Sequence, residues 1–181
     1  MSGSDEDLIL AFQAGDRTAF DALFERYREP IWAFFRRRTP EPADAEELAQ
    51  ETFLALLQAS RRYEPRASFR NYLFGIAFNV LSAWRRKARR NSPAGGGVDV
   101  TTVPAAPVDP SSTIWIRRAL DALDTNDREI LMLREYDALS YAEIAALVRL
   151  PINTVRSRLF RARLALRDRL VGQTQDSGER R

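Results

Sequence analysis

Apolar residues in the last third of the chain recur at three- and four-residue steps, which is the spacing of a buried stripe along a helix. From residue 152 onward this stripe consists of Val155, Leu159, Ala162, Leu166 and Leu170. A shorter apolar face follows Ser140 and Glu143, which have the S-x-x-E spacing of a capping box, and it consists of Ile144, Ala145, Leu147 and Val148. Pro151 separates the two runs, so the pattern predicts a helix-turn-helix whose second helix is capped by Asn153 or Thr154.

The N-terminal half shows the same helical period over four segments. Ser4 and the acidic residues after it begin the first, Gly15 ends it, and Asp16 caps the second. Pro30 predicts a kink in the second segment, where the expected buried residues are Phe20, Leu23, Phe24, Tyr27, Ile31 and Phe34. The fourth helix is expected over residues 68–90 and the third over residues 42–60, where the buried stripe consists of Ala45, Leu48, Ala49, Thr52, Phe53, Leu56 and Leu57.

Residues 91–112 interrupt these patterns with four prolines and three consecutive glycines. Such a composition is typical of an extended, flexible connection between domains. The glycine run is not a phosphate-binding loop, because no strand precedes it and no Lys-Ser pair follows it. We therefore expect an all-α fold of two small domains, residues 1–90 and 113–171, joined by this linker and followed by a disordered tail over residues 172–181.

The composition narrows the chemistry, because the 181 residues include neither cysteine nor histidine. Disulfides, thiolate or imidazole metal ligands, a cysteine nucleophile and a histidine general base are excluded, which removes much of ordinary enzyme chemistry. We expect no catalytic residues, no metal and no cofactor. The pI near 9.7 fits a polyanionic partner. No apolar run approaches the roughly 20 residues of a membrane span. The N-terminus is acidic rather than a basic signal sequence, so we expect a cytoplasmic protein without membrane insertion.

The second helix of the predicted helix-turn-helix is strongly basic. Residues 151–171 contain six arginines and one acid, which gives a net charge of six minus one, or +5. At about 100° per residue, the side opposite the apolar stripe carries Ser157, Phe160, Arg161 and Leu164. Arginine beside exposed apolar residues suits the major groove, where base edges offer acceptors and methyl groups. Arg156 and its neighbours can pair with phosphates. The alternative is a solvated amphipathic helix.

The third predicted helix has an acidic face opposite its apolar stripe. Asp44, Glu47 and Glu51 share this face, and residues 41–51 contain five acids and no base. Like charges at this spacing repel by about 0.2–0.5 kcal/mol per pair, so the cluster has a cost that a function can explain. Three interpretations remain open: a solvated face, a docking site for a basic partner, and a Mg²⁺ site of a nuclease.

The end of the fourth predicted helix combines aromatic and basic residues. Tyr72, Asn79 and Arg86 are seven apart and share a face, Tyr63 precedes the helix, and residues 84–90 carry five positive charges. Aromatic rings beside cations can stack on unpaired bases while the cations hold the phosphate backbone. The pattern therefore favours single-stranded or melted nucleic acid. The alternative is that the apolar residues simply form core, which we expect for Phe69, Leu73, Ile76, Ala77, Val80 and Trp84.

Three stretches together resemble a known family. DAEELAQETFLALLQ (44–58), SFRNYLFGIAFNVLSAWRRKARR (68–90) and LDALDTNDREILMLREYDALSYAEIAALVRLPINTVRSRLFRARLALRDRL (120–170) occur in order on either side of the linker. They resemble bacterial RNA polymerase sigma factors of the sigma-70 family, in the extracytoplasmic-function (ECF) group. The resemblance implies an alternative sigma factor that directs initiation at promoters by binding energy rather than by chemistry.

The resemblance also implies partners and site residues. The third helix would dock on the clamp helices of the largest polymerase subunit through Asp44, Glu47, Leu48, Gln50, Glu51 and Phe53. Residues 61–68 and the fourth helix would capture a flipped base of the melted minus-ten element through Tyr63, Tyr72, Asn79, Trp84, Arg85 and Arg86. The C-terminal domain would contact the flap of the second subunit and read the duplex minus-35 element through Asn153, Thr154, Arg156, Ser157, Phe160 and Arg161. An anti-sigma factor is a further partner that many relatives have.

The chain departs from the family pattern at several positions. Arg149 replaces the usual glycine in the helix-turn-helix turn, and a left-handed conformation there would cost roughly 1 kcal/mol. Asn153 replaces another common glycine, while Ser82 and Ala83 stand where an aspartate is frequent. These changes bear on promoter sequence rather than on class. A helix-turn-helix regulator that is not a polymerase subunit remains the main alternative.

Overall fold

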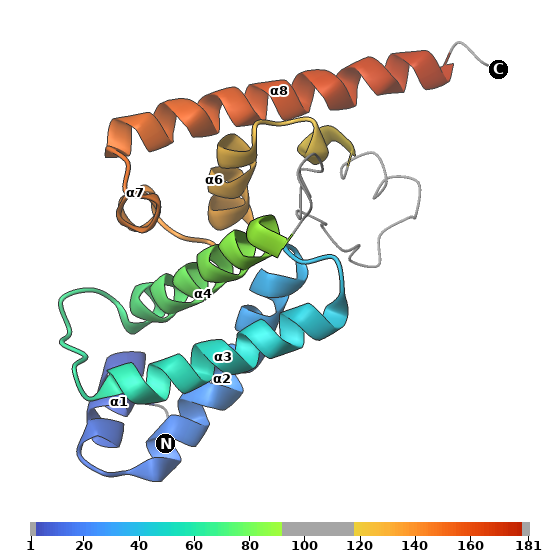
Figure 1. Ribbon diagram of the computed structural model, residues 1–181. Coiled ribbons are helices and arrows are strands. Elements are labelled where there is room, and N and C mark those ends of the chain that lie inside the picture. The colour runs from blue at the N-terminus through green and yellow to red at the C-terminus, as the bar shows by residue number, and fades with distance from the viewer. Residues whose placement is uncertain (1–2, 92–117, 179–181) are drawn as a thin grey trace. The chain divides into compact units, whose positions relative to one another are not determined.

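The computed structural model describes residues 3–91 and 118–178. The chain divides into two compact units, Met1–Thr102 and Val103–Arg181 (Figure 1). All regular structure in the described residues is helical, which confirms the expected all-α, two-domain fold. Most of the predicted linker lies outside the described residues. Among the helices that are described, none is long and apolar enough to cross a membrane.

The N-terminal unit contains α1 (Asp5–Gln13), α2 (Arg17–Arg36), α3 (Pro42–Ser60) and α4 (Phe69–Asn91). Local sequence rules explain the first boundaries. Ser4 forms a capping box with Asp7 at the start of α1, and Asp16 accepts a hydrogen bond from the backbone N–H of Thr18 at the start of α2. Gly15 lies between them with φ +106°, a conformation that L side chains rarely adopt. These helix starts are therefore confirmed as predicted.

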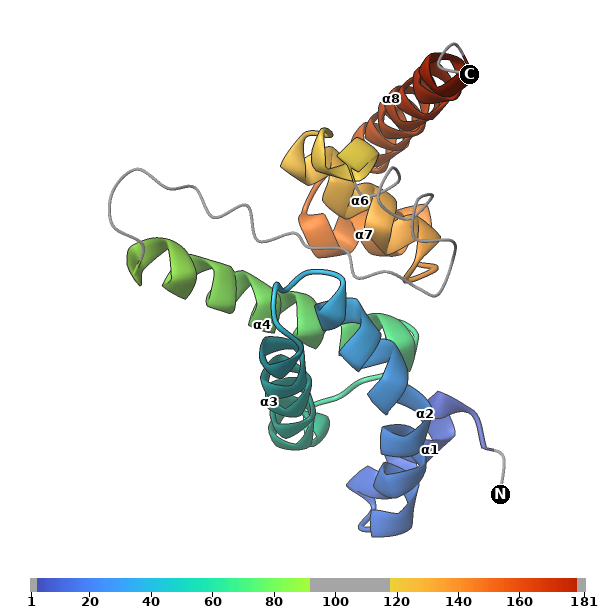
Figure 2. The same ribbon diagram turned by 90° about the vertical axis from the view of Figure 1, so that its right-hand side faces the viewer.

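The core of this unit is built from aromatic side chains at helix crossings. α2 packs on α1 and α3, and α4 packs on α3 (Figure 2). Phe34 is fully buried and makes edge-to-face contacts with Phe35 and Phe74, at centroid distances of 5.1 and 5.7 Å. Two expected core residues are wrong, because Phe24 is 38% exposed and Leu57 is 39% exposed.

The C-terminal unit contains α6 (Thr125–Glu135), α7 (Tyr141–Val148) and α8 (Ile152–Gly178), and residues 118–121 are also helical. α8 packs on α6 and α7 and buries Val155, Leu159 and Ala162 of the predicted stripe. The capping box of Ser140 and Glu143 is present as predicted. The small core of this unit also includes Ile130, Met132, Leu133, Leu139 and Ile144.

Both ends of α8 differ from the prediction. The helix begins at Ile152, so neither Asn153 nor Thr154 precedes it as a cap, and the backbone N–H of Thr154 donates to the carbonyl of Pro151 at 2.9 Å. Pro151 is tolerated there because the first helical N–H groups need no intrahelical acceptor. At the other end, α8 continues to Gly178, whereas a disordered tail was expected from residue 172.

The turn between α7 and α8 contains a strained residue. Arg149 caps the C-terminus of α7 with φ 56° and ψ 46°, and its N–H donates to the carbonyl of Ala145. Left-handed geometry at this position satisfies the last carbonyls of the helix and redirects the chain, a role that glycine usually has. Arg149 therefore has the left-handed conformation whose cost the sequence analysis considered. Ala138, in the loop before α7, also has a positive φ of 51°.

Candidate nucleic-acid interface and acidic docking face

Four of the six arginines of α8 are used inside the C-terminal unit. Arg158 pairs with Asp127 at 3.1 Å and lies 3.9 Å from Asp124, at the start of α6. Arg163 donates to Glu135 at 2.6 Å, and this hydrogen bond, with one to Tyr141, raises the pKa of Arg163. These contacts join residues 31 and 28 positions apart in sequence and hold α8 against α6.

The next two arginines are also engaged. Arg167 pairs with its neighbour Asp168 at 3.0 Å, and Arg169 donates to the carbonyl of Ala122 at 3.1 Å. Arg156 and Arg161 are both exposed, and neither has a hydrogen bond or ion pair within the part of the chain that the structure describes. Judged by the described part of the chain, two of the six arginines of α8 are therefore free to bind an external ligand.

Apolar and small polar side chains accompany these two arginines. Phe160 is 68% exposed, and Leu164 and Ile152 are 37% and 38% exposed. The Ser157 hydroxyl donates to the carbonyl of Thr154 at 3.0 Å, which fixes the side chain while leaving it at the surface. Asn153 is exposed and Thr154 half-buried. All six residues predicted for this surface thus belong to the first turns of α8, opposite or beside its buried stripe.

The acidic face lies on α3. Glu47, Gln50 and Glu51 are exposed and Asp44 is half-buried, and among the described residues none of these acids has a cationic partner. Leu54 lies one turn beyond Gln50 and Glu51 and is 59% exposed, more than any other large apolar side chain in residues 3–91. Leu54 was missed in the sequence, where an apolar residue on an otherwise polar helical face is the signal that identifies it.

Two residues predicted for this face lie elsewhere. Leu48 is 2% exposed and Phe53 is 7% exposed. Phe53 makes an edge-to-face contact with Phe24 at 4.8 Å between ring centroids. Their side chains therefore hold α3 in the core, as the helical period also predicted, and are not available to a partner.

The carboxylates of α3 do not form a metal site. No group of three or more Asp or Glu side chains within the described residues is placed to bind a metal ion, and this includes Asp44, Glu47 and Glu51. A two-metal or one-metal nuclease requires such convergence of oxygen ligands. The geometry gives the nuclease interpretation no support.

The predicted nucleic-acid residues of α4 divide by exposure. Asn79 and Arg86 are exposed, as their shared face requires. Trp84 and Arg85 are half-buried. Tyr72 is half-buried as well, with its hydroxyl donating to the carbonyl of Ala59 at 3.3 Å, and burial raises the pKa of this phenol. The structure therefore brings Asn79 and Arg86 to the surface but commits Tyr72 partly to packing.

Tyr63 lies in the core rather than at the surface. It is 5% exposed, packs against Tyr72 at 4.9 Å and Phe69 at 6.1 Å between ring centroids, and donates to the carbonyl of Ala67 at 3.3 Å. Burial raises the pKa of the Tyr63 phenol. In this conformation its ring face is covered, so the expected stacking of Tyr63 on an unpaired base does not fit the structure. The ring instead supports the loop over residues 61–68 from inside.

Comparisons with known proteins agree with this arrangement. The family model of Sigma-70 region 2 matches residues 23–91, and that of Sigma-70, region 4 matches residues 113–166. The chain is 29% identical over 177 residues to the RNA polymerase sigma-H factor of Pseudomonas aeruginosa, covering 90% of this chain and 91% of that protein. It is 29% identical over 180 residues to the ECF RNA polymerase sigma-E factor of Escherichia coli, covering 90% and 92%.

Solved structures give the same result. One similar structure is CnrH in complex with the cytosolic domain of CnrY, with a TM-score of 0.69 and 26% identity over 94% of this chain and 99% of that one. Another is the sigma factor RpoE in complex with the anti-sigma factor NepR from Bartonella quintana, with a TM-score of 0.70 and 25% identity over 83% and 96%.

The fold, the two surfaces and these matches define a two-domain transcription initiation factor. The chain belongs to the sigma-70 family of RNA polymerase sigma factors, in the ECF group. It is an alternative sigma factor, which binds core RNA polymerase and directs promoter-specific initiation. Proteins of this family are DNA-binding initiation factors rather than catalysts.

Proposed function

We propose that the first turns of α8 read the minus-35 element of the promoter in the major groove. The observation that carries this proposal is the pair Arg156 and Arg161, which are exposed, have no partner within residues 3–91 and 118–178, and flank the exposed ring of Phe160. Guanidinium groups can donate to guanine edges, and an aromatic ring can contact a thymine methyl group. Asn153, Thr154 and Ser157, at the helix start, are suited to phosphates and neighbouring base edges.

Core polymerase binds, in this proposal, to the acidic face of α3 through Asp44, Glu47, Gln50 and Glu51. Acids without internal partners create a negative potential that steers a basic surface such as the clamp helices into contact. Leu54 supplies apolar area at the same face. The flap of the second large subunit is assigned to the C-terminal domain by family resemblance alone.

Melted minus-ten DNA is assigned to the loop over residues 61–68 and the exposed side of α4. Asn79 and Arg86 are available there, and the cations toward the end of the helix can follow the strand backbone. Trp84 and Arg85, which are half-buried, line the margin of this surface. Tyr63 and Tyr72 are assigned to supporting the loop.

The remaining partners follow from the class. Because core polymerase and promoter DNA are cytoplasmic in bacteria, we place the protein in the cytoplasm. The two similar solved structures are complexes, one with the cytosolic domain of CnrY and one with the anti-sigma factor NepR, and this supports an anti-sigma factor as a partner of this chain. Such a partner would have to cover at least one of the surfaces described above.

Run-off transcription from genomic fragments with purified core polymerase tests the whole assignment. Because two domains on one tether engage one promoter, each contact raises the effective concentration of the other. Inserting or deleting several base pairs between the two DNA elements is therefore expected to abolish initiation. Unchanged initiation after such a shift would contradict two-point recognition. Duplex binding without any transcription would favour a regulator that is not a polymerase subunit.

A further inference from the structure

Gln13, the last residue of α1, binds the start of the loop over residues 61–68. Its side-chain Nε2 donates to two backbone carbonyls, that of Ser60 at 2.7 Å and that of Tyr63 at 2.9 Å. Both acceptors lie about 50 positions away in sequence, and both belong to the segment where α3 ends. One amide group thus joins the C-terminus of α1 to the end of α3 and to the third residue of the loop, beside the local hydrogen bond from the Tyr63 N–H to the Ser60 carbonyl at 3.0 Å.

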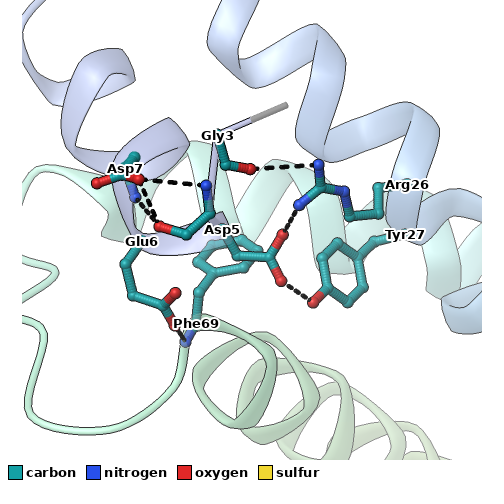
Figure 3. Close-up of polar contacts among 8 residues, drawn as sticks. Gly3, Asp5, Glu6, Asp7, Arg26, Tyr27 and Phe69 are labelled. Carbon is teal, nitrogen blue, oxygen red and sulfur yellow. Dashed lines mark hydrogen bonds and ion pairs between the residues drawn. The ribbon is translucent and has the colours of Figure 1, made fainter. Parts of the chain in front are cut away.

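Glu6, in the first turn of α1, binds the other end of the same loop. Its Oε1 accepts a hydrogen bond at 2.8 Å from the backbone N–H of Phe69, the first residue of α4 (Figure 3). A carboxylate at this position satisfies an orphan N–H and complements the positive end of the helix dipole. Ser68 adds a local cap, since its hydroxyl accepts from the N–H of Asn71 at 3.2 Å.

The helix that supplies these two side chains is itself firmly attached. Figure 3 shows the Asp5 carboxylate between Arg26 and Tyr27 of α2, with one oxygen accepting from each. Ile9 on the same helix is fully buried. The three acids that follow Ser4 therefore have three different structural roles: Asp5 anchors α1 to α2, Glu6 caps α4, and Asp7 completes the capping box of α1 itself.

We propose that α1 is a brace that sets the conformation of the loop over residues 61–68 for capture of melted promoter DNA, with Gln13 and Glu6 as its positioning residues. This inference rests on the proposed role of that loop in binding the minus-ten strand. A loop held at both ends in its binding conformation loses less conformational entropy when a strand docks on it. Neither side chain needs to touch the DNA to have this effect.

The proposal differs from a purely stabilising role in what it predicts for two ligands of one domain. Loss of stability would weaken binding of core polymerase on α3 and of single-stranded DNA at the loop together. Loss of positioning weakens only the DNA contact, because the acidic face of α3 does not involve the loop. The ratio of the two affinities is therefore the decisive quantity.

The experiment uses the full chain in four variants: Gln13→Ala, Gln13→Glu, Glu6→Ala and Glu6→Gln. The DNA probe is a labelled single-stranded oligonucleotide with the non-template sequence of a promoter from which the holoenzyme initiates in run-off transcription. Fluorescence anisotropy measures its affinity for the variant holoenzyme, and co-purification with core polymerase measures the second affinity. Glu29→Gln is the matched control, since it makes the same chemical change as Glu6→Gln at an exposed position of α2.

Gln13→Ala is expected to weaken oligonucleotide binding about fivefold, the effect of losing hydrogen bonds of ordinary net strength. Gln13→Glu should weaken it more, because a carboxylate then faces two carbonyl oxygens. Glu6→Ala should lower both the affinity and the hydrogen-exchange protection of the Phe69 amide, and Glu6→Gln should restore much of each because it keeps an acceptor. Glu29→Gln and all four variants should bind core polymerase normally.

The brace proposal would be wrong if Gln13→Glu and Glu6→Ala bound the oligonucleotide with wild-type affinity. It would also be wrong if the affinities for the oligonucleotide and for core polymerase fell equally. The double variant Arg61→Ala, Arg62→Ala separates this failure from failure of the proposed function. Both arginines are exposed in the loop. If their removal leaves oligonucleotide binding unchanged, the loop does not bind DNA; if it weakens binding while the α1 variants do not, only the brace is wrong.

Discussion

The two charged helices of this protein use their charges in opposite ways. On α8, four of six arginines pair inside the C-terminal domain, and Arg156 and Arg161 remain exposed with no partner among the residues that the structure describes. On α3, none of the acids of the exposed face has an ion pair among the described residues. Among the described residues, the six arginines of α8 therefore leave fewer charges without an ion pair than the acids of α3 do.

This difference in the use of charge follows from the size of the domain to which each helix belongs. The C-terminal domain is small, and ion pairs such as Arg158 with Asp127 join α8 to α6 alongside a limited apolar core. The N-terminal domain packs a larger aromatic core, so α3 is held by Leu48, Phe53 and Leu56 without help from its acids. Charge count along a helix is a poor measure of a binding surface until the internal partners are known.

Reversing the charge of the acidic face should have the largest effect. The double variant Glu47→Arg, Glu51→Arg is expected to weaken association with core polymerase on the order of 100-fold or more, because like charges brought together across an interface cost several kcal/mol. Co-purification with core enzyme measures this loss. Thermal unfolding should change little, since both side chains are exposed. Glu29→Arg, an exposed acid on α2, is the control, and normal co-purification of the double variant would refute the docking face.

Arg156→Ala and Arg161→Ala should each weaken binding to a minus-35 duplex by roughly 10- to 100-fold, the discrimination expected of one arginine–base contact. Arg163→Ala is the matched control, because Arg163 already pairs with Glu135. Its loss should cost less than about 1 kcal/mol of stability and little affinity. Anisotropy at a fixed salt concentration compares the three variants. A larger affinity loss in Arg163→Ala than in the other two would reverse the assignment of free and structural arginines.

Arg158→Ala should affect stability rather than binding. The side chain of Arg158 is 25% exposed and that of Asp127 is 17% exposed, so its removal leaves a partly buried carboxylate without its partner. We expect a loss of about 1–2 kcal/mol in the unfolding free energy of the C-terminal domain. Glu47→Gln on α3 should change the stability of its own domain negligibly. Denaturant titration of both variants measures the two changes in unfolding free energy. Equal changes would contradict the idea that charges stabilise the C-terminal domain and not the N-terminal one.

The smallest predicted effect concerns the positive-φ residue at the C-terminal cap of a helix. In the N-terminal domain the positive-φ residue after α1 is Gly15, whereas in the C-terminal domain Arg149 caps α7. Arg149→Gly relieves about 1 kcal/mol or more of left-handed strain, and the extra freedom of glycine in the unfolded chain offsets about half of that gain. A net stabilisation of about 0.5 kcal/mol is expected from denaturant titration. Destabilisation would mean that the Arg149 side chain makes a favourable contribution that outweighs its strain.

Local features of the sequence predicted much of the fold. The starts of α1, α2 and α7 follow from Ser4, Asp16 and Ser140, since a cap acts on backbone N–H groups two or three residues away. Helical periodicity likewise identified most of the buried stripes. Errors at this level concern the margins of stripes, where Leu57 and Phe24 were expected inside and are exposed.

The candidate sites were predicted less completely. Helical periodicity predicted Leu48 and Phe53 in the core, where the structure has them, whereas the family resemblance assigned them to polymerase binding. Tyr63 precedes a helix in a loop, where no periodicity exists to show that its ring turns inward. Leu54 was overlooked because its neighbours on the same face are polar.

The amino-acid sequence by itself determined the class of protein, the helices and the presence of a basic and an acidic helix, because these depend on composition and on interactions over three or four residues. Only the tertiary structure decided which charges are free and which residues support the loop over residues 61–68. The pairs that decide this, Arg158 with Asp127 and Glu6 with Phe69, join residues 31 and 63 positions apart. Contacts across such separations depend on how helices pack, and no local pattern encodes that packing.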